Sequence, residues 1–154
     1  SRSMKTSVQN CIYGFSTYKN NDLKLLSPND LGRGKMMNIW DLEKITGADI
    51  ANTLEDRFMG SEELYVRFLK KLLYDESYMQ LKDAAQYGDM KGVELKAHTL
   101  KGVCATLGLT ELSDKFSHVV EMVRHGEQDD VKLRACVEDA GNKLRHVLLL
   151  IQDL

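Results

Sequence analysis

Apolar residues between positions 90 and 107 recur at alternating intervals of three and four residues. This spacing places them on one face of a single α-helix and predicts that the face is buried against neighbouring elements. At about 100° per residue, His98 lies about 135° from the middle of the apolar face and therefore points toward solvent. Core packing does not explain a nucleophilic side chain at that position. The residues of the apolar face are Met90, Val93, Ala97, Leu100, Cys104 and Leu107.

The chain from position 39 onward repeats this helical spacing, interrupted by capping residues and glycines. We expect a short apolar turn at 40–45 and helices that begin near positions 49, 61, 75, 89, 110 and 130. Gly88 followed directly by Asp89 combines a helix stop with a helix start, which predicts two antiparallel neighbours. A single proline and only 7% aromatic residues also favour helices over a sheet. The expected fold is all-α, an up-and-down antiparallel four-helix bundle with an additional short N-terminal helix and an N-terminal tail.

Two expectations concern the interior of this bundle. In the helix that begins near position 61, the spacing predicts that Leu64, Phe68 and Leu72 face the core, and that Val66, Leu69 and Leu73 widen this apolar face. In the last helix, Gly141 is less favourable than alanine by about 1 kcal/mol and allows a bend.

Residues 1–38 differ from the rest because they are rich in Ser, Asn, Lys and Gly and have only weak periodicity. The sequence Ser27-Pro28-Asn29-Asp30 is typical of a turn. We interpret residues 1–38 as a tail, as a linker to a preceding domain, or in part as a segment derived from cloning, such as Ser1-Arg2-Ser3. Residues 39–154 should form a single helical domain.

Composition excludes several classes of protein. The formal net charge is −2 and there is no block of Lys and Arg, which argues against a nucleic-acid partner. No apolar run approaches the roughly 20 residues of a membrane span, so we expect no membrane contact by this domain. Cys11, Cys104 and Cys136 are odd in number and have no metal-binding spacing, which favours a reduced, cytoplasmic setting. We expect Cys104 and Cys136 in the core and His146 on the surface.

The predicted exposed face around His98 has unusual neighbours. Gly102 stands one helical turn after the histidine, where glycine is unfavourable, and its missing side chain leaves room for another macromolecule. Lys101 can reach back toward a group attached to the ring, and an ammonium ion suits phosphate oxygens. Leu95 and Ala105 are apolar or small where a solvated face is normally charged, and Lys91 and Glu94 complete the face.

The motif His98-Thr-Leu-Lys101-Gly102, followed by Val-Cys-Ala-Thr-Leu-Gly108, resembles the signature of histidine-containing phosphotransfer (HPt) domains of two-component phosphorelays. Gly60-Ser-Glu-Glu-Leu-Tyr65 and the junction at 88–89 also resemble that family. The resemblance extends from about position 47 to 154 and does not include residues 1–38. Val103 and Cys104 stand where many members have Ala or Ser, which leaves the motif otherwise intact.

The resemblance implies a monomeric four-helix bundle whose exposed histidine carries a phosphoryl group. His98 would accept this group from the aspartyl phosphate of a receiver domain and pass it to another receiver aspartate. Lys101 would neutralise the phosphoryl charge and Gly102 would give steric clearance. The implied partners are response-regulator receiver domains and a sensor histidine kinase. We predict that Lys91, Glu94, Leu95 and Ala105 contact the partner.

The residues themselves favour a carrier over an enzyme. Glu94 is the only carboxylate on the face of His98, and no second general acid or base stands near the ring. We therefore expect no cofactor in this chain and Mg²⁺ only in the partner receiver domain.

Two other interpretations remain at this point. The first is a helical adaptor that binds a receiver domain or another signalling protein without accepting phosphate. The second is a metal-binding bundle, because His118, Glu121 and His125 share one helix face. Three ligands from one exposed helix make a poor metal site without supporting hydrogen bonds, so we predict no metal there.

Overall fold

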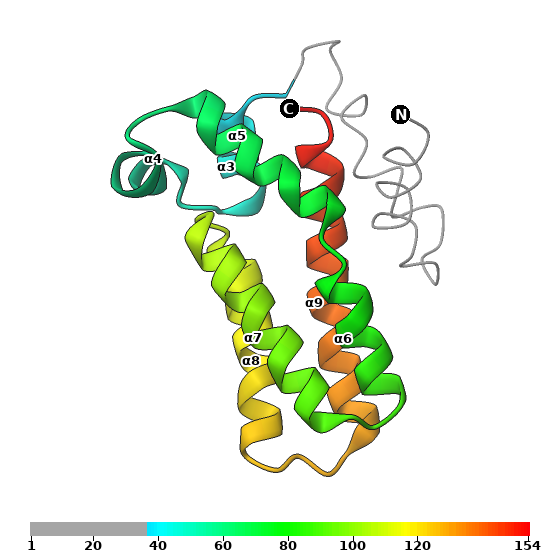
Figure 1. Ribbon diagram of the computed structural model, residues 1–154. Coiled ribbons are helices and arrows are strands. Elements are labelled where there is room, and N and C mark those ends of the chain that lie inside the picture. Colours follow the sequence, from blue (N-terminus) through cyan, green and yellow to red (C-terminus); the bar gives the residue numbers. More distant parts are fainter. Residues whose placement is uncertain (1–36) are drawn as a thin grey trace.

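A computed structural model describes residues 37–154, and residues 1–36, which include most of the predicted tail, lie outside the described part. The described residues contain no strand. Met37 is buried and Asn38 caps the first described helix, so these two residues belong to the folded domain. The elements are α3 (Ile39–Thr46), α4 (Ile50–Phe58), α5 (Glu62–Lys71), the 3₁₀ turn η1 (Leu72–Tyr74), α6 (Ser77–Gln86), α7 (Met90–Thr106), α8 (Thr110–Arg124) and α9 (Asp130–Ile151) (Figure 1).

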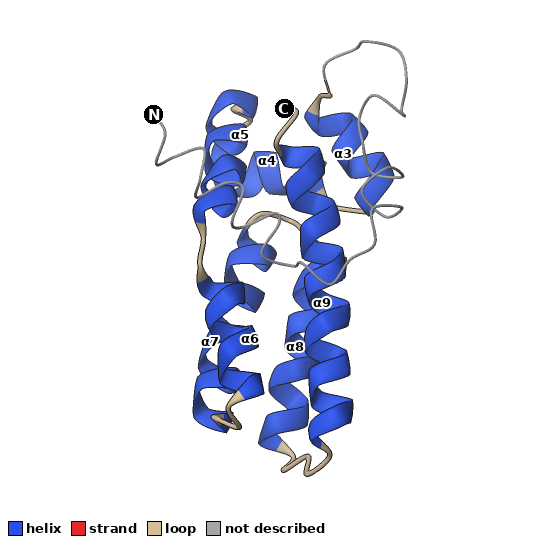
Figure 2. Cartoon of the chain, turned by 90° about the vertical axis from the view of Figure 1, so that its right-hand side faces the viewer, coloured by secondary structure: helices blue, strands red, loops and turns tan. Residues whose placement is uncertain are grey.

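Four of these helices form the bundle. Helix α7 packs against α6 and α8, and α9 packs against α8 and α6, which closes the ring. The chain alternates in direction from α6 to α9 (Figure 1), so the predicted up-and-down antiparallel four-helix bundle is confirmed. The shorter helices α3, α4 and α5 gather at the end of the bundle where α9 ends (Figure 2). None of the helices within residues 37–154 is long and apolar enough to cross a membrane.

Capping side chains begin the helices where the sequence predicts. The Asp49 carboxylate accepts the backbone N–H of Asn52 at 3.4 Å, and the Ser61 hydroxyl accepts that of Leu64 at 3.2 Å. Asp89 accepts the N–H of Gly92 at 3.0 Å and so begins α7. The junction between α6 and α7 is therefore as short as the sequence indicates, and it holds the two helices side by side.

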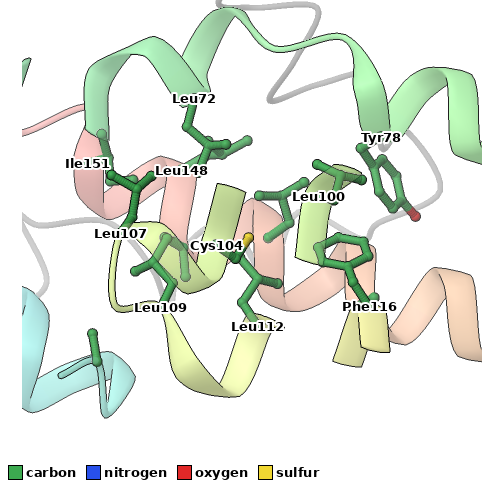
Figure 3. Close-up of a cluster of buried hydrophobic side chains, with 14 of the residues drawn as sticks. Leu72, Tyr78, Leu100, Cys104, Leu107, Leu109, Leu112, Phe116, Leu148 and Ile151 are labelled. Atoms are coloured by element: carbon green, nitrogen blue, oxygen red, sulfur yellow. The ribbon is translucent and has the colours of Figure 1, made fainter. Parts of the chain in front are cut away.

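The apolar face predicted for α7 is buried, except that Met90 is only half-buried. It contributes to a continuous core with α6, α8, α9 and η1 (Figure 3). The rings of Tyr78 and Phe116 meet edge to face with centroids 6.4 Å apart. The labelled residues of this cluster are Leu72, Tyr78, Leu100, Cys104, Leu107, Leu109, Leu112, Phe116, Leu148 and Ile151.

The expectation that Phe68 faces the core is wrong. Phe68 is 40% exposed, and Tyr65 is fully buried in α5 together with Leu69. The Tyr65 hydroxyl donates a 2.7 Å hydrogen bond to the Leu107 carbonyl. Burial, with a smaller contribution from Glu43, raises the pKa of that hydroxyl. The apolar residues of α5 cover about half of its circumference, and Tyr65 lies near the middle of this arc while Phe68 lies toward one edge.

Gly141 allows α9 to pack closely against α6. Helix α9 continues through it, and a Cβ atom at this position would overlap with the ring and hydroxyl of Tyr78. That hydroxyl donates to the Val137 carbonyl at 3.1 Å. The absent side chain thus gives α6 room to bring Tyr78 against α9.

Three expectations for cysteine and histidine have mixed outcomes. Cys104 is buried as predicted, and burial, with a smaller effect of Asp75, raises the pKa of its thiol to about 12. Cys136 is only half-buried, because it lies at the margin of the apolar face of α9.

The expectation that His146 lies at the surface is wrong, because its side chain is half-buried. Burial is the main reason that the pKa of His146 is lowered, and the positive charges of Lys143 and Arg145 lower it further.

Candidate functional site

His98 is exposed on α7, as the helical spacing predicts. Its neighbours Ala97 and Leu100 are buried at 0% and 1% exposure, and these residues fix the rotation of α7 in the bundle. Because α7 is packed between α6 and α8, the imidazole projects from a rigid element. The site therefore presents a histidine to an approaching molecule without a change in the fold.

A groove with a volume of about 620 Å³ lies next to His98, between α7 and the α5–η1 segment. Its volume is in the range of sites that hold a small molecule or a few side chains. The α5 side of this groove could not be predicted from the sequence, because it depends on how α5 is placed relative to α7. Two sets of residues line the groove. On the α7 side these are His98, Thr99, Gly102, Val103, Thr106 and Leu107. On the opposite side they are Phe68, Lys71, Leu72 and Asp75.

Phe68 and Lys71 form a defined pair on the α5 side. The Lys71 ammonium lies 4.4 Å from the centroid of the Phe68 ring, a cation–π contact. The ring of Phe68 also packs edge to face on Phe58, with centroids 5.5 Å apart. The only sequence signal for this pair is the i,i+3 spacing of an aromatic residue and a lysine.

Gly102 lines the same groove, and the space where its side chain would stand is open. A Cβ atom at this position would have no neighbour within 4 Å. At Gly108, by contrast, a Cβ would overlap with Thr53 and lie 2.6 Å from the Asp49 carbonyl oxygen. The described fold thus needs glycine at 108 and does not need it at 102, which is unusual for a helix interior where glycine is unfavourable.

The other flank of His98 faces α8. The carbonyl of Lys101 accepts a 3.0 Å hydrogen bond from the Ser113 hydroxyl, and Lys101 is half-buried. The Arg124 guanidinium donates to Glu94 at 2.8 Å. This hydrogen bond with Glu94 is the main reason that the pKa of Arg124 is raised. Glu94, a predicted partner-contact residue, is therefore already paired within the chain.

The remaining predicted contact residues are accessible. Lys91 and Ala105 are exposed, and the apolar side chain of Leu95 is 60% exposed. Together with His98 and Gly102 they form one exposed face of α7, as expected from their spacing.

The residues considered for metal binding do not form a site. Within residues 37–154, no group of three or more His, Cys, Asp or Glu side chains could hold a metal ion. Nδ1 of His125 lies 2.7 Å from the carbonyl oxygen of Glu121 in the preceding turn. His118 is exposed on the same helix. This part of the chain thus gives no support to the metal-binding interpretation.

The described part of the chain is a helical bundle in which His98 is exposed beside a groove. Gly102, which lines the same groove, is not required by the packing of the fold. The family model of the Hpt domain matches residues 63–149, more than half of the chain, and the chain therefore belongs to the Hpt domain family. Comparisons with curated proteins and with solved structures gave no match. Hpt domains are histidine phosphotransfer carriers of phosphorelays rather than classical enzymes, and they interact with receiver domains and histidine kinases.

Proposed function

We propose that His98 is the phosphoacceptor of this domain and relays a phosphoryl group between two receiver aspartates. The observation that carries this proposal is the exposed imidazole of His98 beside the open space at Gly102. A partner of protein size can approach the ring there without meeting a side chain from the following turn.

The chemistry requires little of this chain beyond position and charge. An unprotonated ring nitrogen of His98 attacks the phosphorus of the aspartyl phosphate. The N–P bond forms as the O–P bond breaks, and the aspartate leaves as a carboxylate. A neutral imidazole carries a nucleophilic lone pair on one of its two ring nitrogens. Such transfers depend mainly on in-line alignment and charge neutralisation.

Lys101 supplies positive charge on the α8 flank in this proposal. Arg124 contributes less, because its charge is offset by Glu94 at 2.8 Å. Glu94 is the carboxylate on the His98 face of α7, and its ion pair with Arg124 makes it a poor ligand for a metal ion. We therefore assign the Mg²⁺ ion of the reaction to the acidic residues of the receiver.

We assign receiver contact to the exposed face of α7 that Lys91, Leu95 and Ala105 form with the histidine. Leu95, 60% exposed, supplies apolar area that a partner can bury. Glu94 would take part through its pair with Arg124. We further propose that the domain acts as a monomer without catalytic activity of its own. A cytoplasmic location agrees with the free thiols of Cys104 and Cys136.

The experiment that tests this proposal is phosphotransfer from phosphorylated receiver domains. We expect an acid-labile, base-stable phosphoryl label on the wild-type chain and none on His98→Gln. His118→Gln, which removes another exposed histidine, is the matched control and should label normally. Equal labelling of His98→Gln would refute the assignment. Receiver binding without any label would instead favour the helical adaptor.

A further inference from the structure

The site contains a second lysine that the motif around His98 does not include. Lys71 lies at the end of α5 and lines the same groove as His98. Its side chain is exposed, and no ion pair of Lys71 is found among the described residues. No carboxylate of residues 37–154 therefore lies within 4.0 Å of its ammonium group.

The position of the Lys71 ammonium is restricted. It lies 4.4 Å from the centroid of Phe68, a residue that also lines the groove. Phe68 in turn packs on Phe58 of α4. A lysine held on an aromatic ring loses less conformational freedom when it binds an anion than a lysine free in solvent.

The charges around His98 are unequal on its two flanks. On the α8 flank, Arg124 is paired with Glu94 and Lys101 remains as the cation. On the α5 flank, the charged groups of the groove are Lys71 and Asp75. Oδ1 of Asp75 accepts the backbone N–H of Ser77 at 2.7 Å, which turns this carboxylate toward the start of α6.

We propose that Lys71 is a second phosphoryl-neutralising residue, which meets the phosphoryl group of His98 from the α5 side while Lys101 acts from the α8 side. This inference rests on the proposed function of His98. A phosphoryl group near pH 7 carries between one and two negative charges on three oxygens, so two cations on opposite flanks can both contribute. The groove gives the group room to turn toward Lys71.

A titration of the phosphorylated domain alone tests the role of Lys71. Phosphoramidate serves as the donor: a ring nitrogen of His98 attacks its phosphorus, the P–N bond breaks and ammonia leaves. The second ionisation of the phosphoryl group is then followed by ³¹P NMR as a function of pH. A nearby cation favours the dianion, so Lys71→Gln should decrease this ionisation constant about 3- to 10-fold, as for a charge within about 6 Å at a protein surface.

Two variants make the result specific. Lys71→Arg keeps the charge and should keep most of the wild-type constant. Lys70→Gln removes the neighbouring charge from the same last turn of α5, and Lys70 does not line the groove, so the constant should stay at the wild-type value. This control also accounts for loss of charge at the helix C-terminus.

The outcomes separate this inference from the function on which it rests. An unchanged constant in Lys71→Gln, or an equal decrease in Lys70→Gln, would overturn the role of Lys71 and leave His98 as the phosphoacceptor. Absence of label on the wild-type chain, or an undiminished label on His98→Gln, would overturn both.

Discussion

The Tyr65 hydroxyl donates a 2.7 Å hydrogen bond to the carbonyl oxygen of Leu107, and this bond joins α5 to the C-terminal end of the helix that carries His98. Both residues are buried, with exposures of 0% and 3%. The contact holds α5 beside α7 and thereby sets one wall of the groove next to the histidine.

Removal of this hydroxyl should weaken the domain. Tyr65→Phe leaves the Leu107 carbonyl buried without its donor, which should lower the free energy of unfolding by about 1–2 kcal/mol. Urea denaturation monitored by circular dichroism measures the change. Tyr87→Phe, at a residue that is 81% exposed, is the control and should be neutral. Equal stabilities of the two variants would show that the bond contributes nothing.

Gly102 should matter for the approach of a receiver domain and should not be needed for the stability of the fold. Gly102→Ala should stabilise the domain by up to about 1 kcal/mol, because alanine favours the helix and its Cβ enters open space. Transfer from a phosphorylated receiver should slow by roughly tenfold, because misalignment of the reacting atoms is costly. Labelling by phosphoramidate should be unchanged, since this small donor needs no protein surface at Gly102. Receiver transfer at the wild-type rate would contradict the clearance role.

Gly141 should respond in the opposite sense to Gly102, although both glycines are in helix interiors. Gly141→Ala places a methyl group against Tyr78, and such overpacking should cost about 1–3 kcal/mol of unfolding free energy. Thermal and urea denaturation report the loss. The cost should decrease in a Tyr78→Ala background, where the obstructing ring is gone. A cost that does not depend on Tyr78 would rule out this contact as its origin.

His146 should make the stability depend on pH. Its pKa is lowered in the folded chain, first by burial and then by Lys143 and Arg145, so the unfolded chain binds its proton more readily. The stability contributed by the neutral ring is therefore present above the unfolded pKa of about 6.5 and is lost as the pH falls below it. Urea denaturation at pH 7.5 and 5.5 should show a smaller difference for His146→Gln than for the wild type. The same difference in both would exclude His146 as the origin.

Much of the fold could be predicted because its signals are local. The capping residues Asp49, Ser61 and Asp89 and the intervals of three and four residues depend only on the geometry of a single helix. In α5 the expected core face included Phe68, but Tyr65, which lies near the middle of a broad apolar arc, proved to be the buried aromatic residue.

The sequence by itself determined the helices, their alternation and the outward direction of His98, because each follows from hydrogen bonding and side-chain spacing within one segment. Only the tertiary structure decided that Lys71 and Phe68 border the groove of His98, that Glu94 is paired with Arg124, and that Gly141 accommodates Tyr78. These relationships depend on the angle and distance at which two helices cross. The periodicity of either helix alone contains no information about that crossing.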